Sequence, residues 1–313
     1  MPRISVAIAN MNGRRFLAPC LRALAQQTRP PDETVVVDSA STDGSQQLVV
    51  AGYPQVRLVE LHRRPGITAA FNACIRQTQG DAIVLLNNDT EVAPGWLAAL
   101  ESAVGTHPGA GSFASKVIFA KDRTTINAAG DFYTPAGRPG NRGVWERDHG
   151  QYDRSCWVFG AMAAAALYRR AALEDVGPFD EGLGSYCEDI DWAFRAQLRG
   201  WRCRYVPEAV VYHHGSATGG GELASYSCGR NFPLVFVKNM PPPLYRRFFG
   251  RMVLRQVRDL VENLPHLREP AARARLRGQA AALRALPDYL GRRRHVQRTR
   301  RVGADAIERI LEK

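Results

Sequence analysis

Long hydrophobic runs and paired cysteines are both missing from this chain of 313 residues. The longest apolar stretch, residues 158–168, is about half as long as the roughly 20 residues that a membrane-spanning helix needs. The six cysteines form no C-x-x-C pair, which argues against a zinc site and favours reduced core residues in a cytosolic protein. No signal-peptide pattern is present in MPRISVAIANMNG. We therefore expect a cytoplasmic protein whose only membrane contact is peripheral.

Two nucleotide-binding signatures are absent as well. No G-x-G-x-x-G follows the first predicted strand, so the sequence gives no support to a dinucleotide cofactor. No G-x-x-x-x-G-K-[ST] occurs either, which argues against a P-loop nucleotidase.

Positive charge is abundant but confined to the C-terminal quarter of the chain. Residues 241–313 hold 18 Arg or Lys against 7 Asp or Glu, and this net +11 accounts for nearly all of the chain's +12. A partner of negative charge is therefore expected there: a phospholipid surface, a phosphorylated substrate or nucleic acid. A solvated helical face that binds nothing is the alternative.

Buried-strand patterns alternate with helical patterns in the first part of the chain. The strand patterns cover residues 4–9, 34–37, 56–61 and 81–86. Such alternation predicts an α/β fold with a mainly parallel sheet and helices on both faces. Because ligands gather at the carboxyl ends of the strands in such sheets, Asp38 and Asp89, which fall there, are candidate site residues.

The character of the sequence changes at about residue 240. Before that point, residues 110–155 look like a variable loop region with short strands, and residues 158–167 like one more buried strand. After it, apolar residues recur at helical spacing with arginines along the other side, at Phe249, Val253, Val257, Leu260 and Leu264. This pattern predicts a basic amphipathic helix, and two further helices follow over residues 271–290 and 292–311. We therefore divide the chain into an α/β domain, 1–240, and a basic helical extension, 241–313.

Asn87-Asn88-Asp89 comes directly after a strand and presents one carboxylate. A hard cation such as Mg²⁺ or Mn²⁺ binds oxygen ligands together with the phosphates of its substrate. A turn cap explains the same residues without a ligand. His213-His214 ends a later strand, and in a chain that holds such an acidic motif one of the two is a candidate metal ligand.

Glu188-Asp189-Ile190-Asp191 places three acids at the start of a predicted helix. Like charges this close raise the pKa of at least one carboxyl group and favour a general base. Electrostatic stabilisation of the helix N-terminus is the structural alternative, above all for Asp191. Asp38 has two interpretations as well, because it could hydrogen-bond a nucleobase or ribose, or cap the next helix.

Seven motifs in one order link these residues to a known family. They are SVAIANMNG, VVVDSASTDGS, GITAAFN, GDAIVLLNNDT, VGPFDE, EDIDWAFRAQLRGW and VVYHHGS. Over about residues 3–240 the chain resembles the family-two glycosyltransferases with a GT-A fold, in particular the rhamnosyltransferase-like branch that builds bacterial surface polysaccharide. One departure matters for metal binding: the acidic triplet begins with Asn87, so Asp89 is its only carboxylate.

The resemblance implies a role for each matching residue. Asp189 would be the catalytic base with Glu188 beside it, and Asp89 and His213 would hold the metal, with His214 the rival of His213. The remaining roles are donor binding for Asn12, Asp38, Gly66, Asn72, Asn88 and Arg230, and an acceptor-side role for Asp191 and Trp192.

The implied reaction is a single displacement that inverts the sugar. A hexose, with rhamnose among the candidates, would pass from a nucleotide-diphosphate donor to a hydroxyl of a polysaccharide or polyprenyl-diphosphate-linked acceptor, assisted by Mg²⁺ or Mn²⁺. The basic extension would bring the enzyme to the inner face of the cell membrane, because its apolar-faced helices with few aromatics fit an anionic lipid surface better than nucleic acid. The alternatives are a sugar nucleotidyltransferase and a protein that binds nucleic acid or an anionic surface.

Overall fold

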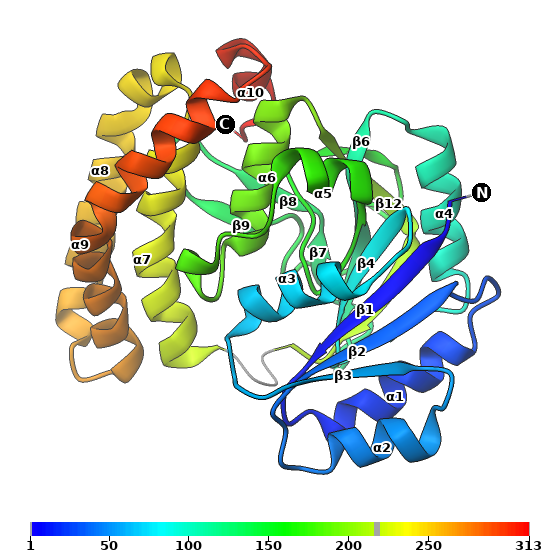
Figure 1. Cartoon of the computed structure of the whole chain (residues 1–313). Helices are drawn as coiled ribbons and strands as arrows, with labels where there is room; N and C mark the ends of the chain where they lie inside the picture. The colour runs from blue at the N-terminus through cyan, green and yellow to red at the C-terminus, as the bar shows by residue number, and fades with distance from the viewer. Residues whose placement is uncertain (1, 216–219, 313) are drawn as a thin grey trace.

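Strands and helices alternate through the N-terminal part of the chain, as the sequence predicts (Figure 1). The structure is a computed structural model that describes residues 2–215 and 220–312. The strands are β1 (Ile4–Asn10), β2 (Glu33–Ser39), β3 (Arg57–Leu61), β4 (Ala82–Asn87), β5 (Thr90–Val92), β6 (Ala110–Phe119), β7 (Ile126–Ala129), β8 (Asp131–Tyr133), β9 (Pro139–Asn141), β10 (Cys156–Val158), β11 (Ala165–Arg169) and β12 (Arg202–His213). The helices are α1 (Arg14–Ala25), α2 (Ser45–Gly52), α3 (Ile67–Gln77), α4 (Trp96–Thr106), α5 (Arg170–Val176), η1 (Glu181–Leu183), α6 (Glu188–Arg199), α7 (Gly221–Asn239), α8 (Pro242–Asn263), η2 (Leu264–His266), α9 (Pro270–Arg298) and α10 (Ala304–Ile310).

One large mixed sheet forms the centre of the molecule. Its strand order is β10-β12-β6-β11-β4-β1-β2-β3, with β5 paired to β12 and β7 to β6. The β4-β1-β2-β3 half is parallel, as predicted, whereas β11 runs antiparallel to both of its neighbours and β12 is parallel to β6. The parallel half therefore brings the carboxyl ends of β1, β2 and β4 to the same edge.

Helices cover both faces of the sheet because each strand directs apolar side chains alternately to one face and to the other. Val6 and Ile8 of β1 belong to a buried cluster with α1, α2 and α4, and Ala7 and Ala9 to a second cluster with α3, α5 and α6. This arrangement confirms the predicted GT-A-like α/β class, with the helical C-terminal part present as predicted.

Two predictions for the middle of the chain are wrong. Residues 110–155 contain β6, a ten-residue strand in the centre of the sheet with nine of its residues buried. The predicted strand over 158–167 is divided between β10 and β11, because residue Gly160 leaves the sheet and its carbonyl accepts a hydrogen bond from the Asp131 amide at 3.0 Å.

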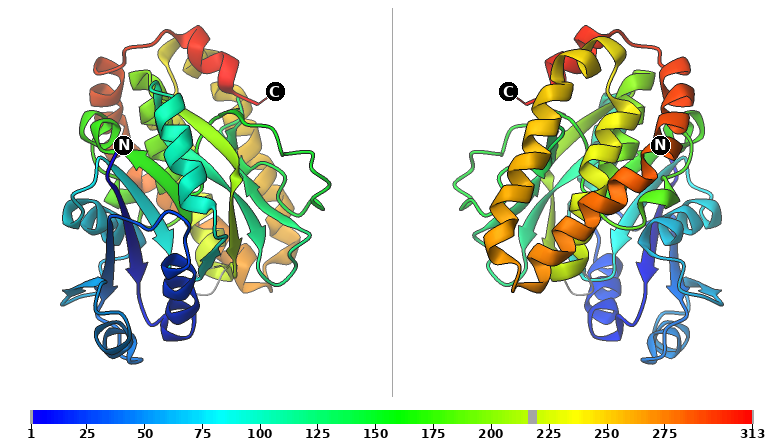
Figure 2. Two further views of the ribbon diagram at one scale, coloured as in Figure 1. Left: turned by 90° about the vertical axis from the view of Figure 1, so that its right-hand side faces the viewer. Right: turned by 90° about the vertical axis from the view of Figure 1, so that its left-hand side faces the viewer.

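The C-terminal helices share a third hydrophobic core with the α/β part. This cluster joins Tyr133, Phe159 and Phe194 to residues of α7, α8, α9 and α10. Figure 2 shows α7, α8 and α9 side by side in one layer. The last two helices differ from the predicted ones, because α9 continues through Gly291 to Arg298 and the chain turns before α10. In the part of the chain that the structure describes, no helix is long and apolar enough to cross a membrane.

The amphipathic pattern of α8 is present, but its predicted apolar stripe faces outward. Leu244, Phe248 and Met252 are the apolar side chains that α8 buries in the third core. The stripe predicted from the sequence is 40–49% exposed at every position, namely Phe249, Val253, Val257, Leu260 and Leu264. Among the residues that the structure describes, the helix therefore carries two apolar faces, one buried in the third core and one largely exposed.

Candidate active site

A chain of hydrogen bonds joins the ends of the three central parallel strands. The Asn10 side chain donates to the Asp38 carboxylate at 2.7 Å and accepts from the Asn88 amide at 2.6 Å. Asp38 is fully buried, and it also accepts from the Ser41 amide and from Gln46. In this geometry Asp38 fixes the loop after β2, which agrees with the capping alternative, and its contact with a nucleobase stays a prediction.

The loop after β1 carries Asn12, one of the residues predicted to bind the donor. Asn12, at φ +50°, accepts from the Thr42 amide at 2.8 Å, and its own amide donates to Ser41. The loops after β1 and β2 are thereby tied together beside Asp38, and the donor-binding role of Asn12 stays a prediction. Gly66 stands at φ +85° before α3, a conformation that favours glycine.

Asp89 and His213 lie next to each other at the centre of the strand edge. The distance between Asp89 Oδ1 and His213 Nε2 is 3.3 Å, and both side chains are buried. Burial opposes ionisation of Asp89, but the hydrogen bond and the charge of His213 outweigh it and hold the pKa of the carboxyl below its ordinary value. The His214 ring turns away and contacts Glu91 at 3.0 Å, so of the two imidazoles it is that of His213 that meets the Asp89 carboxylate, while the His214 amide donates to the Asp89 carbonyl at 2.9 Å.

The surroundings of His213 make Nε2 the ring nitrogen that could bind a cation. Its Nδ1 lies 2.8 Å from the Asn127 side-chain oxygen and donates to it, so Nε2 is the nitrogen that faces Asp89 and would bind an ion in place of its proton. Two oxygen or nitrogen ligands of a small octahedral ion are about 3 Å apart, close to the observed spacing. Within residues 2–215 and 220–312 no group of three His, Cys, Asp or Glu side chains is placed to hold a metal. The pair therefore fits a divalent ion whose other ligands come from a substrate.

Asp189 stands at the start of α6 and is linked by hydrogen bonds to the residues around the end of β4. Its carboxylate accepts from the Ala163 amide at 3.2 Å and from the Ile190 amide at 2.8 Å. The next residue, Ala164, accepts from the Asn87 amide at 2.8 Å, so β4 and the start of α6 are joined through one short turn. The fold thus brings the EDID motif and the NND motif to one place, 100 residues apart in sequence.

The base candidate sits in a cluster of carboxyl groups. Burial, and after it the charge of Asp189, raise the pKa of Glu188 to about 8. Burial raises the pKa of Asp189 itself. Asp131 lies on the other side, where burial and the charge of Asp189 raise its pKa well above the ordinary value. One oxygen of Glu188 and one of Asp131 have no hydrogen-bond partner, which is typical of groups kept for function.

Two predicted acceptor-side residues do not reach the surface. Asp191 is fully buried and binds Arg195, Lys238 and Asn239, so it holds α6 to α7. Burial alone would raise the pKa of Asp191, but the positive charges of Lys238 and Arg195 outweigh that effect and hold the pKa down to about 2. Trp192 is fully buried too, and its indole donates to the Gly177 carbonyl at 3.1 Å. Both residues therefore stabilise the fold in this structure, and their acceptor-side role stays a prediction.

Asn72 and Arg230 are also engaged with the protein. Asn72 is buried in α3 and bonds both the amide and the carbonyl of Phe179, which ties α3 to the GPFDE segment. Arg230 donates to Asn231, whose amide in turn holds the carbonyls of the turn before α6. The structure thus gives both a positioning role within the protein, and their predicted part in donor binding stays a prediction.

Three site residues were not predicted from the sequence. Asn10 holds Asp38, and Asn127 holds His213. Asp131 is the third, and its pKa is raised by the nearby charge of Asp189 after burial. Asn10 ends a buried strand, which is the same signal that identified Asp38. Asn127 and Asp131 follow no such signal, since their positions depend on the pairing of β7 with β6 and on the bridge to Gly160.

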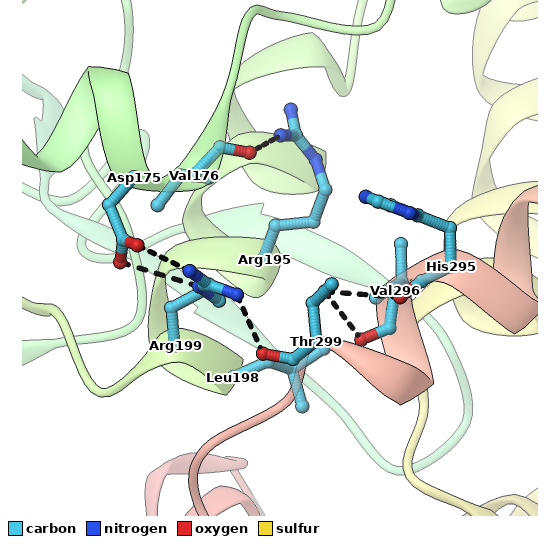
Figure 3. Close-up of a pocket in the computed structure, with 8 residues that line it drawn as sticks. All are labelled: Asp175, Val176, Arg195, Leu198, Arg199, His295, Val296 and Thr299. Atoms are coloured by element: carbon cyan, nitrogen blue, oxygen red, sulfur yellow. Dashed lines mark hydrogen bonds and ion pairs between the residues drawn. The ribbon is translucent and has the colours of Figure 1, made fainter.

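A pocket in Figure 3 lies apart from these groups, between α6 and the end of α9. Arg199 crosses it, paired with Asp175 and donating to the Thr299 carbonyl at 2.8 Å. Arg195 donates to the Val176 carbonyl at 2.9 Å. The charged groups are thus satisfied within the protein, and the pocket marks a junction between the α/β part and the extension.

Comparison with known proteins identifies the family of the chain. Residues 5–177 match the family described as "Glycosyl transferase family 2". The chain is 31% identical over 237 residues to the N-acetylglucosaminyl-diphospho-decaprenol L-rhamnosyltransferase of Mycobacterium tuberculosis, a match that covers 68% of this chain and 75% of that protein.

Two solved structures support the fold. The mannosyltransferase PcManGT of Pyrobaculum calidifontis, in complex with GDP-Man and Mn²⁺, matches with a TM-score of 0.56 and 21% identity over 95% of this chain and 86% of its own. GalNAc-T7 with UDP, GalNAc and Mn²⁺ matches with a TM-score of 0.61 and 16% identity over 76% of this chain and 48% of its own. At such identities the likeness shows the fold alone.

Proposed function

Because the chain belongs to glycosyl transferase family 2 and is of the rhamnosyltransferase-like type, we propose that it transfers a hexose from a nucleotide-diphosphate sugar to a lipid-linked glycan. Rhamnose is the first candidate for the hexose, and the transfer inverts the anomeric carbon. The observation that carries the proposal is the arrangement of Asp189 beside the Asp89–His213 pair, joined through the Ala163–Ala164 turn. The name of the mycobacterial relative supports a polyprenyl-diphosphate-linked acceptor.

In this proposal each site residue has a separate role in the reaction. Asp189 removes the proton from the acceptor hydroxyl as its oxygen attacks the anomeric carbon, and the nucleoside diphosphate leaves on the opposite face. Glu188, protonated at neutral pH by its raised pKa, adds no second charge beside the base. The loops that Asn12 and Asn88 fix at the ends of β1 and β4 hold the donor side.

Asp89 and His213 are the residues that would hold a divalent ion, Mg²⁺ or Mn²⁺. Such an ion offsets the charge that grows on a departing diphosphate. The two solved relatives with Mn²⁺ support this choice of ion. Since only two protein ligands face each other here, the affinity for the ion is expected to depend on the donor's phosphates.

A thermal-shift screen of nucleotide sugars with Mn²⁺ and Mg²⁺ tests the proposal. We expect a raised melting temperature with one class of nucleotide sugar only when a divalent ion is present, because a ligand that binds the folded state alone stabilises it. The sugar identified in this way is then tested for transfer to a short-chain, diphosphate-linked N-acetylglucosamine. Stabilisation by free nucleoside triphosphates with release of diphosphate would instead support the sugar nucleotidyltransferase alternative, which family membership argues against.

The outward apolar face of α8 supports docking of the extension to an anionic membrane surface. Leu254 and Val261 are 69% and 57% exposed, beside the outward stripe already described. Exposed arginines flank this face, among them Arg246 and Arg251. A second copy of the chain would present the same positive charge, so anionic lipid is the better complement. In this proposal the enzyme works at the inner face of the cell membrane, where a lipid-linked acceptor is within reach.

Binding to vesicles tests this placement. The full chain is expected to sediment with vesicles containing phosphatidylglycerol at low salt, and to be released at high salt. Leu254→Glu with Val261→Glu should abolish sedimentation, whereas Val50→Glu, at an exposed site on α2, should not. Equal sedimentation of all three proteins would count against the α8 face. If the native chain does not bind vesicles but forms a dimer that the Leu254→Glu, Val261→Glu variant loses, the α8 face would be assigned to self-association.

A further inference from the structure

We propose that Trp145 and Phe119 form a platform on which a sugar ring of the acceptor stacks, beside the Asp89–His213 pair. Trp145 lies in the segment between β9 and β10 and is 74% exposed, the highest value among the large hydrophobic side chains that the structure describes. Its ring stacks on Phe119 with centroids 4.3 Å apart and planes 15° from parallel. A flat, rigid indole presents a large apolar surface at low entropic cost. This inference rests on the proposed function, because it assigns the acceptor of that reaction.

Strand register places the platform next to the site. Phe119 ends β6 and is the parallel partner of His213, which ends the longer β12. Side chains of paired residues project from the same face of a sheet, so Phe119 stands beside the histidine that meets Asp89. The Ala120 amide also donates to the His213 carbonyl at 2.8 Å.

Sheet order places the platform on the acceptor side. Asp38, Asn10 and Asn88 stand at the ends of β2, β1 and β4, whereas β6 lies on the other side of β4, beyond β11. The Asp89–His213 pair joins the end of β4 to β12, the strand that follows β6 in the sheet. A sugar stacked on Trp145 is therefore opposite the predicted nucleotide side, where an attacking acceptor belongs.

The loop that carries the indole is held in place. The Trp145 amide donates to the Ile126 carbonyl at 3.0 Å, and the residue after Ile126 is Asn127, which holds His213. Lys116 of β6 is buried and pairs with both Asp148 and Asp153 at 2.6 Å. The platform and the metal-ligand pair are thus fixed by neighbouring residues, and little order has to be gained on binding.

Backbone strain points to a function for the indole. Trp145 has φ +68°, a conformation that is unfavourable for a bulky side chain. The other non-glycine residues with positive φ in the described ranges are Asn12, Ala40, Tyr186 and Cys187. All four stand within two residues of predicted site residues or in the loop that Asn12 forms. Such strain gathers at functional sites, and a glycine or asparagine would satisfy the turn at lower cost.

Direct binding of a defined probe tests the platform. The probe is N-acetylglucosamine linked through diphosphate to a farnesyl chain, titrated calorimetrically into the full chain. Trp145→Gly removes the indole while relieving the positive φ, so it is expected to keep the native melting temperature and to weaken probe binding roughly tenfold. Trp145→Phe should recover most of the affinity. Binding of the donor nucleotide with Mn²⁺ should be the same in all three proteins.

The outcomes separate this inference from the proposed function. Equal affinity of the native chain and Trp145→Gly for the probe overturns the platform, as does absence of probe binding by the native chain. A lowered melting temperature with unchanged probe affinity also overturns it, since the indole would then only cover Phe119. Tryptophan-dependent probe binding without any sugar transfer would leave the platform standing and contradict the transferase proposal.

Discussion

Asp189→Asn should lower the rate of sugar transfer by about 10²–10⁴-fold while leaving donor binding intact, since a positioned general base contributes that much. The amide keeps the size of the side chain, and one oxygen remains to accept from Ala163 or Ile190. Single-turnover rates with the identified donor measure the loss, and calorimetric titration of the donor with Mn²⁺ measures retained binding. Asp131→Asn serves as the matched control, because it changes a carboxyl of the same cluster that touches no backbone amide on α6.

The same substitution has a pH signature that a merely structural role would not produce. Glu188 has a pKa raised to about 8 in the folded protein, so the folded state holds its proton more tightly than the unfolded state. Folding stability is therefore expected to fall as pH rises from about 4.5 to about 8. Removing the Asp189 charge should lessen that fall, and Glu188→Gln should remove the part that Glu188 contributes, leaving the part due to Asp189 and Asp131. Urea unfolding at pH 5 and pH 8 measures both, and an unchanged pH dependence in Asp189→Asn would contradict the coupling.

Loss of metal-dependent donor binding is the second large effect we expect. Asp89→Ala removes the only carboxylate of the NND motif and should weaken Mn²⁺-dependent donor binding at least about a hundredfold, by comparison with the 10–100-fold that outer partners of a metal ligand contribute. His213→Ala should act in the same direction. Asn127→Ala should cost about tenfold, because the imidazole then loses the partner that fixes its orientation.

His214→Ala is the control for this series. His214 contacts Glu91 and the Phe16 ring, so its loss should leave the donor affinity within twofold of the native value. Calorimetric titrations with and without Mn²⁺ make the comparison, and circular dichroism checks that each variant is folded. An equal loss in His213→Ala and His214→Ala would contradict the assignment of the ligand.

The sequence was most informative where chemistry follows a regular pattern. Asp38 and Asp89 could be placed at strand ends because buried strands are short apolar runs with polar residues after them. The pair His213-His214 could not be resolved from sequence, since the direction of each side chain depends on the antiparallel contact of β5 with β12. The burial of Asp191 was not predicted for a related reason: it meets Lys238 of α7, a partner 47 residues away.

The features that could not be predicted from the sequence depend on tertiary contacts. β6 was predicted as loop because its sequence, AGSFASKVIF, mixes small and polar residues that the sheet buries all the same. Asp131 was missed because a bridge to Gly160 turns it toward Asp189. On α8 the periodicity was predicted correctly, but periodicity alone does not show which of two apolar faces meets the core.

The third hydrophobic core has a consequence for recombining members of this family. Phe194 of α6 packs in the same cluster as Phe248 of α8 and Tyr289 of α9, and Arg199 crosses to Thr299. A chimaera that exchanged the C-terminal helices at residue 240 would cut this core in two. The exchangeable unit therefore has to include α6, and with it Asp189, so that the tail and the base are inherited together.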